Sequence, residues 1–177
     1  MALRPMVGAA ALLATLAAAW IWPPSARVLQ GGLENNVGYL YLHGIGVDRN
    51  PRQAIAWYKR AAERGLATAE YNLGYLYQTG SGDGIPPDAR AAVRWYELAA
   101  AQGHADACNN LAMIYADGSL GVRDLPRARA WLKRAVAVAS QDSMAVLDAN
   151  LAALEHDMSP DQVARSEALF ATLPRGR

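Results

Sequence analysis

A segment that recurs along this chain limits its possible folds more than any other feature. Residues 36–41 read Asn-Val-Gly-Tyr-Leu-Tyr, and residues 72–77 read Asn-Leu-Gly-Tyr-Leu-Tyr. A looser copy, Asn-Leu-Ala-Met-Ile-Tyr, occupies residues 110–115. The final tyrosines of the three copies are 36 and 38 residues apart. A period of this size predicts an array of stacked helical repeats.

Each repeat is expected to contain two helices. In the first helix of the first repeat, Val37, Leu40 and Tyr41 are spaced i, i+3, i+4 and therefore share one face. Gly38 lies inside the same helix, where glycine costs about 1 kcal/mol relative to alanine, so we expect a neighbouring helix to approach closely there. The aromatic residues at repeat positions are predicted to form the core: Tyr41, Trp57, Tyr77, Trp95, Tyr115 and Trp131.

The starts of the second helices are marked by capping residues. Asn50, Asp88 and Asp124 each stand seven residues before the repeat tryptophan, and Asn and Asp are favoured N-caps. Pro51 suits the first helical position, and Gln53 is expected to complete a capping box.

The repeat pattern weakens toward the C-terminus. Ala112 replaces the helix glycine, and Leu132 replaces the tyrosine that follows the tryptophan in the first two repeats. Residues 143–155 predict one more first-type helix, and Ser159-Pro-Asp-Gln162 predicts a capping box that opens a last helix. Terminal repeats are expected to be atypical, because one face lacks a neighbour.

The chain begins with a hydrophobic segment. Residues 6–22 contain no charged side chain, Arg4 precedes them and Pro23-Pro24 follow. A cleaved signal peptide fits the basic start and the alanines at 17–19. A retained membrane anchor fits Trp20 and Trp22, although 17 residues is near the lower limit for spanning a bilayer. Both interpretations place the repeats outside a bacterial inner membrane, anchored there or released to the periplasm. Gly31-Gly32 is expected to be a linker.

Composition excludes several classes. The net charge is +1 without a basic block, so nucleic acid is not an expected partner. Cys108 is the only cysteine, so no internal disulfide forms. The three histidines lie far apart in the sequence, and no metal-ligand or nucleophile motif is present. We therefore expect no cofactor, no metal and no catalytic residue.

The pattern Leu-Gly-x-x-Tyr-x-x-Gly, followed by Ala-x-x-Trp-Tyr-x-x-Ala-Ala-x-x-x-Gly, resembles the Sel-like repeat family of tetratricopeptide-type proteins. The resemblance implies an all-α fold: an α/α solenoid of three repeats plus a C-terminal capping helix pair, behind an N-terminal hydrophobic helix. The predicted division is 1–30 for the signal peptide or anchor and linker and 31–174 for the repeat domain, with repeats at about 35–70, 71–108 and 109–142 and the cap at 143–173.

The family resemblance also bears on function. Family members mostly act as adaptors, which implies a protein partner bound on a concave surface at the bacterial cell envelope. The expected partner-binding residues lie on the first helices: Asn36, Tyr39, Asn72, Tyr75 and Asn110. The alternatives are an envelope enzyme, such as a hydrolase, or a binder of glycan or another small ligand. A branch of the family linked to β-lactamase activity carries paired cysteines, which this chain lacks.

Overall fold

The computed structural model describes residues 24–82 and 84–175 of the chain. Within them the structure contains helices and no strands, which confirms the predicted all-α fold. The helices are α2 (Pro24–His43), α3 (Pro51–Glu63), α4 (Ala67–Thr79), α5 (Ala89–Ala101), α6 (Ala105–Asp117), α7 (Leu125–Val138), α8 (Gln141–His156) and α9 (Pro160–Thr172). The hydrophobic segment 6–22 lies outside the described residues.

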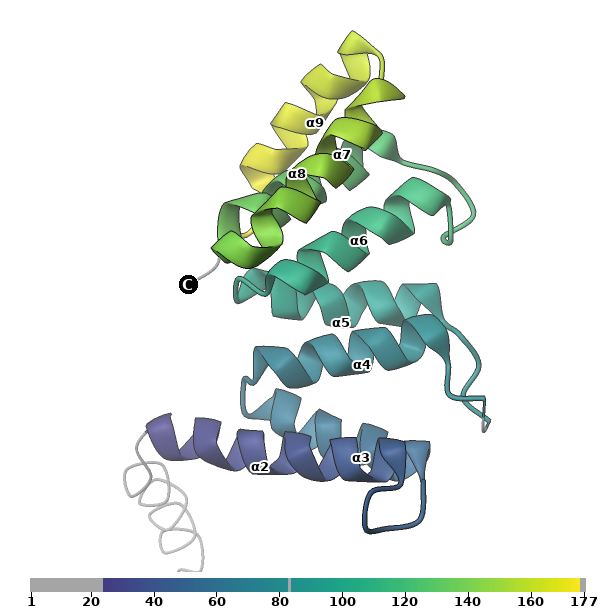
Figure 1. Ribbon diagram of the computed structural model, residues 1–177, viewed down its shortest axis with the longest axis vertical. Helices are drawn as coiled ribbons and strands as arrows, with labels where there is room; N and C mark the ends of the chain where they lie inside the picture. The colour runs from purple at the N-terminus through teal and green to yellow at the C-terminus, as the bar shows by residue number, and fades with distance from the viewer. Residues whose placement is uncertain (1–23, 83, 176–177) are drawn as a thin grey trace, which may run out of the picture.

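The helices stack in chain order along the long axis of the molecule (Figure 1). We call α2, α4, α6 and α8 the A helices, and α3, α5, α7 and α9 the B helices. Each A helix of the first three pairs packs most closely on its own B helix, and each of the B helices α3, α5 and α7 then packs on the next A helix. In the final pair, α8 and α9 both pack on α7, as a cap would.

The helix α2 begins earlier than the sequence predicts. Gly31 and Gly32 are not a linker; both lie inside α2, which starts at Pro24. A methyl group added to Gly31 would lie 3.5 Å from atoms of Ala61, Arg64 and Leu66, so this part of α2 packs against the end of α3. Glu34 on α2 fixes the contact by accepting hydrogen bonds of 2.7 and 3.1 Å from the Arg64 guanidinium.

Two of the glycines inside A helices, Gly38 and Gly74, allow tyrosine rings to pack directly on the helix backbone. A Cβ atom on Gly38 would lie 2.7 Å from the Tyr58 ring, and one on Gly74 would lie 2.5 Å from the Tyr96 ring. Real Cβ atoms do not approach ring atoms this closely, so only glycine fits. Both tyrosines are almost completely buried. The expected close helix approach is therefore confirmed, and it occurs within each repeat.

The turn from each A helix to its B helix is held by one recurring hydrogen bond. The backbone N–H groups of Asn50, Asp88 and Asp124 donate to the carbonyl oxygens of the repeat tyrosines, Tyr41, Tyr77 and Tyr115, over 2.8, 2.6 and 2.8 Å. The side chains of the same three residues cap the next helix, as predicted. The capping box expected from Gln53 is wrong, because the Asn50 N–H is already bonded to Tyr41.

The predicted core aromatics are placed unequally. Tyr115 and Trp131 are buried, and Tyr41, Tyr77 and Trp95 pack on the core while partly exposed. Trp57 is also partly exposed, and the guanidinium of Arg60 lies 4.8 Å from its ring centroid.

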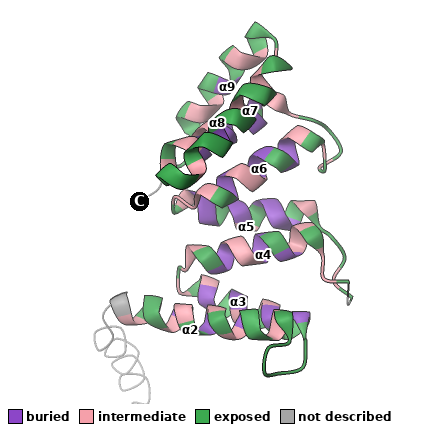
Figure 2. Cartoon of the chain, in the orientation of Figure 1, coloured by how far each residue is buried: buried purple, intermediate pink, exposed green. Residues whose placement is uncertain are grey.

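The fully buried positions of α3 and α5 are instead Tyr58 and Tyr96, each one residue after the tryptophan. The side chains of consecutive residues on a helix point about 100° apart. Because the tyrosine points at the glycine of the A helix, the tryptophan before it points to the edge of the helix pair and stays partly exposed. Figure 2 shows the buried residues on the helix faces that meet within and between repeats.

The cap is joined to the third repeat by a buried arginine. Arg129 on α7 is 8% exposed and donates 2.7 Å hydrogen bonds to Glu155 on α8 and Glu167 on α9. It also donates to the buried Ser166 hydroxyl over 2.6 Å. The Ser159 capping box at the start of α9 is confirmed in both directions. One side chain thus positions both cap helices.

Substitution of Gly74 by alanine tests the packing of the tyrosine on the A helix. We expect Gly74→Ala to lower the free energy of unfolding by about 1–3 kcal/mol, because the new methyl group overlaps the Tyr96 ring. The matched control is Gly32→Ala in α2, where no atom lies within 4 Å and alanine should stabilise by about 0.5–1 kcal/mol. Denaturant unfolding measures both; equal effects would contradict the packing described.

Candidate partner-binding face

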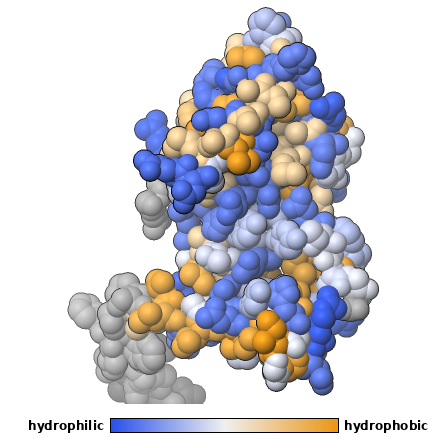
Figure 3. Space-filling model, in the orientation of Figure 1, coloured by the Kyte–Doolittle hydropathy of each residue, from blue (hydrophilic) through white to orange (hydrophobic). Residues whose placement is uncertain are grey.

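The A helices form one face of the array and lie on its inner side. Within the three repeats, α2 contacts α4 and α4 contacts α6, whereas the B helices α3, α5 and α7 approach one another less. An array whose elements are closer on one side curves toward that side, so the A helices line the concave surface. In Figure 3, hydrophilic side chains predominate over α4 in the middle of this view, and hydrophobic ones gather over α8 above it. We call this surface the A face.

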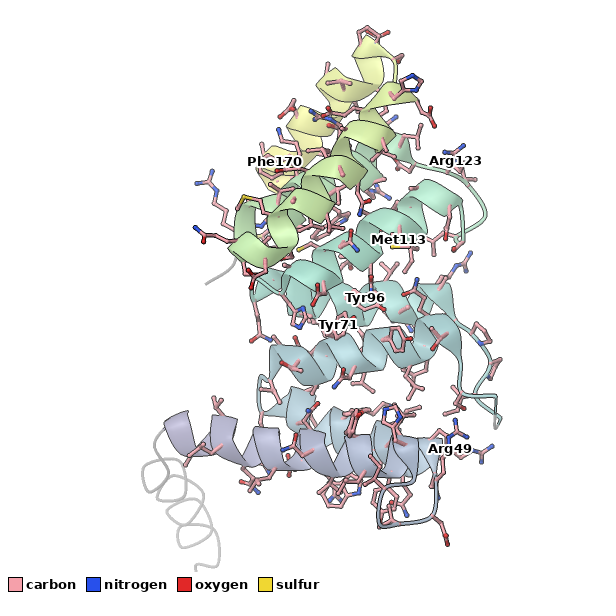
Figure 4. All side chains as sticks on the ribbon, viewed as in Figure 1. Arg49, Tyr71, Tyr96, Met113, Arg123 and Phe170 are labelled. Atoms are coloured by element: carbon pink, nitrogen blue, oxygen red, sulfur yellow. The ribbon has the colours of Figure 1, made fainter. Side chains whose placement is uncertain are left out.

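Three large apolar side chains are exposed at the same repeat position of the A face. Tyr39 on α2, Tyr75 on α4 and Met113 on α6 are 49%, 50% and 53% exposed. Tyr39 is braced by His43, whose ring centroid is 4.2 Å away. Figure 4 shows Met113 on α6 beside α8. Sequence reasoning selected the two tyrosines and missed Met113, although its repeat position was the signal. We call these three residues the apolar row.

The apolar row ends at a groove between α6 and α8. The groove has a volume of about 190 Å³, larger than an engineered core cavity of about 150 Å³ that holds benzene. It therefore has room for one leucine, methionine or phenylalanine side chain. Its lining carries no charged residue: Asn109, Ala112, Met113, Ala116, Leu132, Asn150 and Leu154. The groove exists because α6 and α8 barely touch.

The three asparagines predicted to bind a partner differ in their surroundings. Asn36 is exposed. Asn72 donates a 2.9 Å hydrogen bond to Asn35 on the preceding A helix, and Asn110 donates a 2.9 Å hydrogen bond to the Tyr96 hydroxyl. Asn72 and Asn110 thus connect helices, which leaves Asn36 as the asparagine open to a ligand. Contact of any of them with a partner stays a prediction.

A cluster of rings lies between α4 and α6. The rings of Tyr71 and His104 are stacked with centroids 4.6 Å apart, and Tyr71 lies 5.8 Å from Tyr96 (Figure 4). The Tyr96 hydroxyl donates to Gln78 over 2.7 Å and accepts from Asn110. Burial raises the tyrosine pKa of Tyr96 and lowers the pKa of His104, so both rings stay neutral near pH 7. The cluster rigidifies the A face.

The described residues contain no group of three or more His, Cys, Asp or Glu side chains placed to hold a metal ion. Cys108 is fully buried, and burial raises the pKa of its thiol to about 12, so the reactive thiolate is scarce. No helix within residues 24–82 and 84–175 is long and apolar enough to cross a membrane.

Comparison with known proteins agrees with this geometry. The Sel1 repeat family matches residues 34–66, 67–104 and 105–137, which is more than half of the chain. This protein belongs to the Sel1 repeat family. Sel1 repeat proteins are protein–protein interaction scaffolds, and their fold is typically non-catalytic.

Solved structures share the fold. The Sel1 repeat protein from Oxalobacter formigenes superimposes with a TM-score of 0.63 at 28% identity, over 88% of this chain and 63% of that one. A protective antigen of uropathogenic Escherichia coli, with the same kind of repeat, gives a TM-score of 0.50 at 28% identity over 79% of this chain and 37% of the antigen.

Two curated relatives match over a single repeat length. A putative sel1-like repeat-containing protein of Acanthamoeba polyphaga mimivirus is 46% identical over 44 residues. A component of an ERAD-associated E3 ubiquitin-protein ligase of Arabidopsis thaliana is 45% identical over 49 residues. The matches cover 25% and 27% of this chain and 8% of each relative, so they carry repeat identity and not the relatives' activities.

The buried state of Cys108 predicts slow thiol chemistry. We expect a disulfide reagent such as DTNB to leave the folded protein almost unmodified and to label one thiol per chain in denaturant. The physical reason is that the sulfur must leave the core before it can ionise. The labelling is measured by absorbance. Rapid labelling of one thiol per chain in the folded protein would contradict this placement.

Alanine substitutions of Asn110 and Asn36 are expected to differ in their effect on stability. Asn110→Ala should lower stability by about 1–2 kcal/mol, because it removes a hydrogen bond from the part-buried Tyr96 hydroxyl. Asn36→Ala should change stability by less than about 0.5 kcal/mol, because its side chain is exposed. Thermal denaturation of the two variants checks this difference; equal melting temperatures would argue against it.

Proposed function

We propose that this protein is an interaction scaffold of the bacterial cell envelope that binds a protein partner on the A face. The observation that carries the proposal is the apolar row: three large side chains, each about half exposed, at one repeat position and leading into an apolar groove. Exposed apolar side chains aligned on a concave surface are typical of interaction sites. Aromatic side chains also anchor interfaces at low entropic cost.

The A face favours an extended, uncharged segment of the partner. An extended chain turns every second side chain toward the same face. Large apolar side chains at alternate positions of the segment would therefore face the apolar row, and the last of them would enter the groove. The groove lining has no charge to complement a charged side chain. Asn109 and Asn150 line the same groove and supply amide donors and acceptors for the partner's backbone.

The envelope location rests on the N-terminal segment. Residues 6–22 are uncharged and apolar, and they directly precede Pro23 and the start of α2. As an anchor, this segment would hold the repeats close to the membrane; as a signal peptide, it would release them to the periplasm. Either way the partner is an envelope protein. A glycan or small-molecule ligand is the alternative, and the groove is its site.

Two single substitutions test the A face. We expect Tyr75→Ala and Met113→Ala each to weaken partner binding by about tenfold or more, which corresponds to about 1.4 kcal/mol, while the melting temperature changes little. Leu98→Ala on α5 is the matched control, because Leu98 is 50% exposed outside the A face.

The measurement is crosslinking capture from native membranes, quantified by mass spectrometry. A partner that Leu98→Ala retains and Tyr75→Ala loses supports the proposal. A partner captured equally by all variants, or capture of glycan fragments alone, overturns it. The N-terminal peptide of the bait, read in the same experiment, distinguishes an anchor beginning at Met1 or Ala2 from a cleaved signal.

A further inference from the structure

A second pocket lies at the junction of the third repeat and the cap. It is formed by the α6–α7 loop, the first turn of α7 and the first half of α9, and its volume is about 620 Å³. It shares no lining residue with the groove between α6 and α8. Its lining combines apolar and basic residues: Leu120, Val122, Leu125 and Pro126 are apolar, Arg123, Arg127 and Arg165 are basic, and Tyr115, Asp124 and Gln162 complete the lining.

Two of the three arginines lack an ion pair within the described residues. The Arg127 guanidinium stacks over the Tyr115 ring, 5.0 Å from its centroid. The Arg123 Nε donates a 2.7 Å hydrogen bond to the Ala116 carbonyl, which leaves its two terminal nitrogens available. Within residues 24–82 and 84–175, the structure shows no ion pair for Arg123 or Arg165. Arg123 and Arg165 therefore offer guanidinium donors to a ligand, whereas Arg127 is shared with Asp124.

The acids near the pocket leave a net positive charge. Asp124 is the one acid in the lining; its Oδ1 accepts from the Arg127 backbone N–H, and its Oδ2 is 3.7 Å from the Arg127 guanidinium. Glu97 on α5 is a second acid whose charge interacts with that of Arg127. Burial raises the pKa of the Glu97 carboxyl, and the positive charge of Arg127 opposes that rise. The lining thus carries three positive charges and one negative charge, in a chain whose net charge is only +1.

The repeat architecture does not require this arrangement. At the position of Arg127 the first two repeats carry Gln53 and Ala91, and both repeats form the same turn. Arg123 differs, since Arg49 makes the equivalent bond to the Leu42 carbonyl in the first repeat. Arg127 and Arg165 are therefore additions of the third repeat and the cap, and the turn that the repeats share does not require them.

We propose that this pocket binds a phosphomonoester carried on an apolar group. A phosphomonoester has a charge of about −1.5 to −2 at pH 7, which matches the lining, whereas a single carboxylate has −1. A planar guanidinium group can donate two parallel hydrogen bonds to two oxygens of one phosphate. Three guanidinium groups line this pocket. The apolar residues of the lining would contact the organic part of the ligand, and the volume lies within the range of ligand pockets, about 300–1,000 Å³.

Titration calorimetry of the full-length chain in neutral detergent tests the proposal with phenyl phosphate, inorganic phosphate and benzoate as probes. We expect phenyl phosphate to bind at least tenfold more tightly than either of the others. Arg165→Gln and Arg127→Gln should each weaken phenyl phosphate binding by about tenfold or more. The matched control is Arg90→Gln, which removes the same charge from an exposed arginine outside the pocket.

The outcomes separate the possibilities. Equal binding of benzoate and phenyl phosphate, no binding of any probe, or an Arg165→Gln variant that behaves like Arg90→Gln overturns the proposal. Binding to vesicles of neutral lipid is compared with binding to the same vesicles containing added phosphatidic acid, which tests whether the phosphate belongs to a lipid. Enhanced vesicle binding that Arg165→Gln abolishes supports a lipid headgroup, and phenyl phosphate binding without that enhancement supports a soluble ligand. Because the pocket is separate from the A face, either result leaves the scaffold proposal standing on its own test.

Discussion

The architecture depends on the contact between a helix backbone and a tyrosine ring. Gly38 and Gly74 let Tyr58 and Tyr96 lie directly on the preceding A helix, which sets how closely the two helices of a repeat approach. The third repeat changes both partners: Ala112 takes the place of glycine, and Leu132 takes the place of tyrosine. Both of these residues are buried. The third repeat thus replaces the glycine–tyrosine pair by an alanine–leucine pair and keeps the two helices packed. A larger residue on the A helix goes with a smaller one on the B helix.

Helix spacing in turn determines which face is available for binding. Because α2, α4 and α6 touch in succession while α3, α5 and α7 approach one another less, the three repeats curve around their A helices. Tyr39, Tyr75 and Met113 point away from the packed layer and are left exposed on the inner side. Asn72 and Asn110 are used to connect the helices beneath them. The same face therefore combines a rigid polar base with an exposed apolar row, which suits recognition of a partner without large rearrangement.

The sequence predicted the features that depend on local chemistry and missed those that depend on tertiary packing. The N-caps Asn50, Asp88 and Asp124 and the helix glycines follow from local chemistry at a fixed period, and all of them are confirmed. The exposure of Trp57 was not predictable, because tryptophan and tyrosine stand next to each other and periodicity alone does not decide which one enters the core. Gly31-Gly32 suggested a linker, since its contact with the end of α3 depends on tertiary packing. The groove between α6 and α8 also depends on tertiary packing, because the position of α8 relative to α6 cannot be predicted from a local sequence pattern.

The attachment of the cap has a consequence for the groove. The helix α8 is held by α7 and by the pair of Arg129 with Glu155, and it barely touches α6 across the groove. Arg129 also bonds Glu167 and Ser166, so the position of α8 is mechanically linked to that of α9. The groove thus has one wall that belongs to the repeats and another that belongs to the cap. A change in how the cap packs on α7 would therefore alter the groove without altering the packing between the repeats.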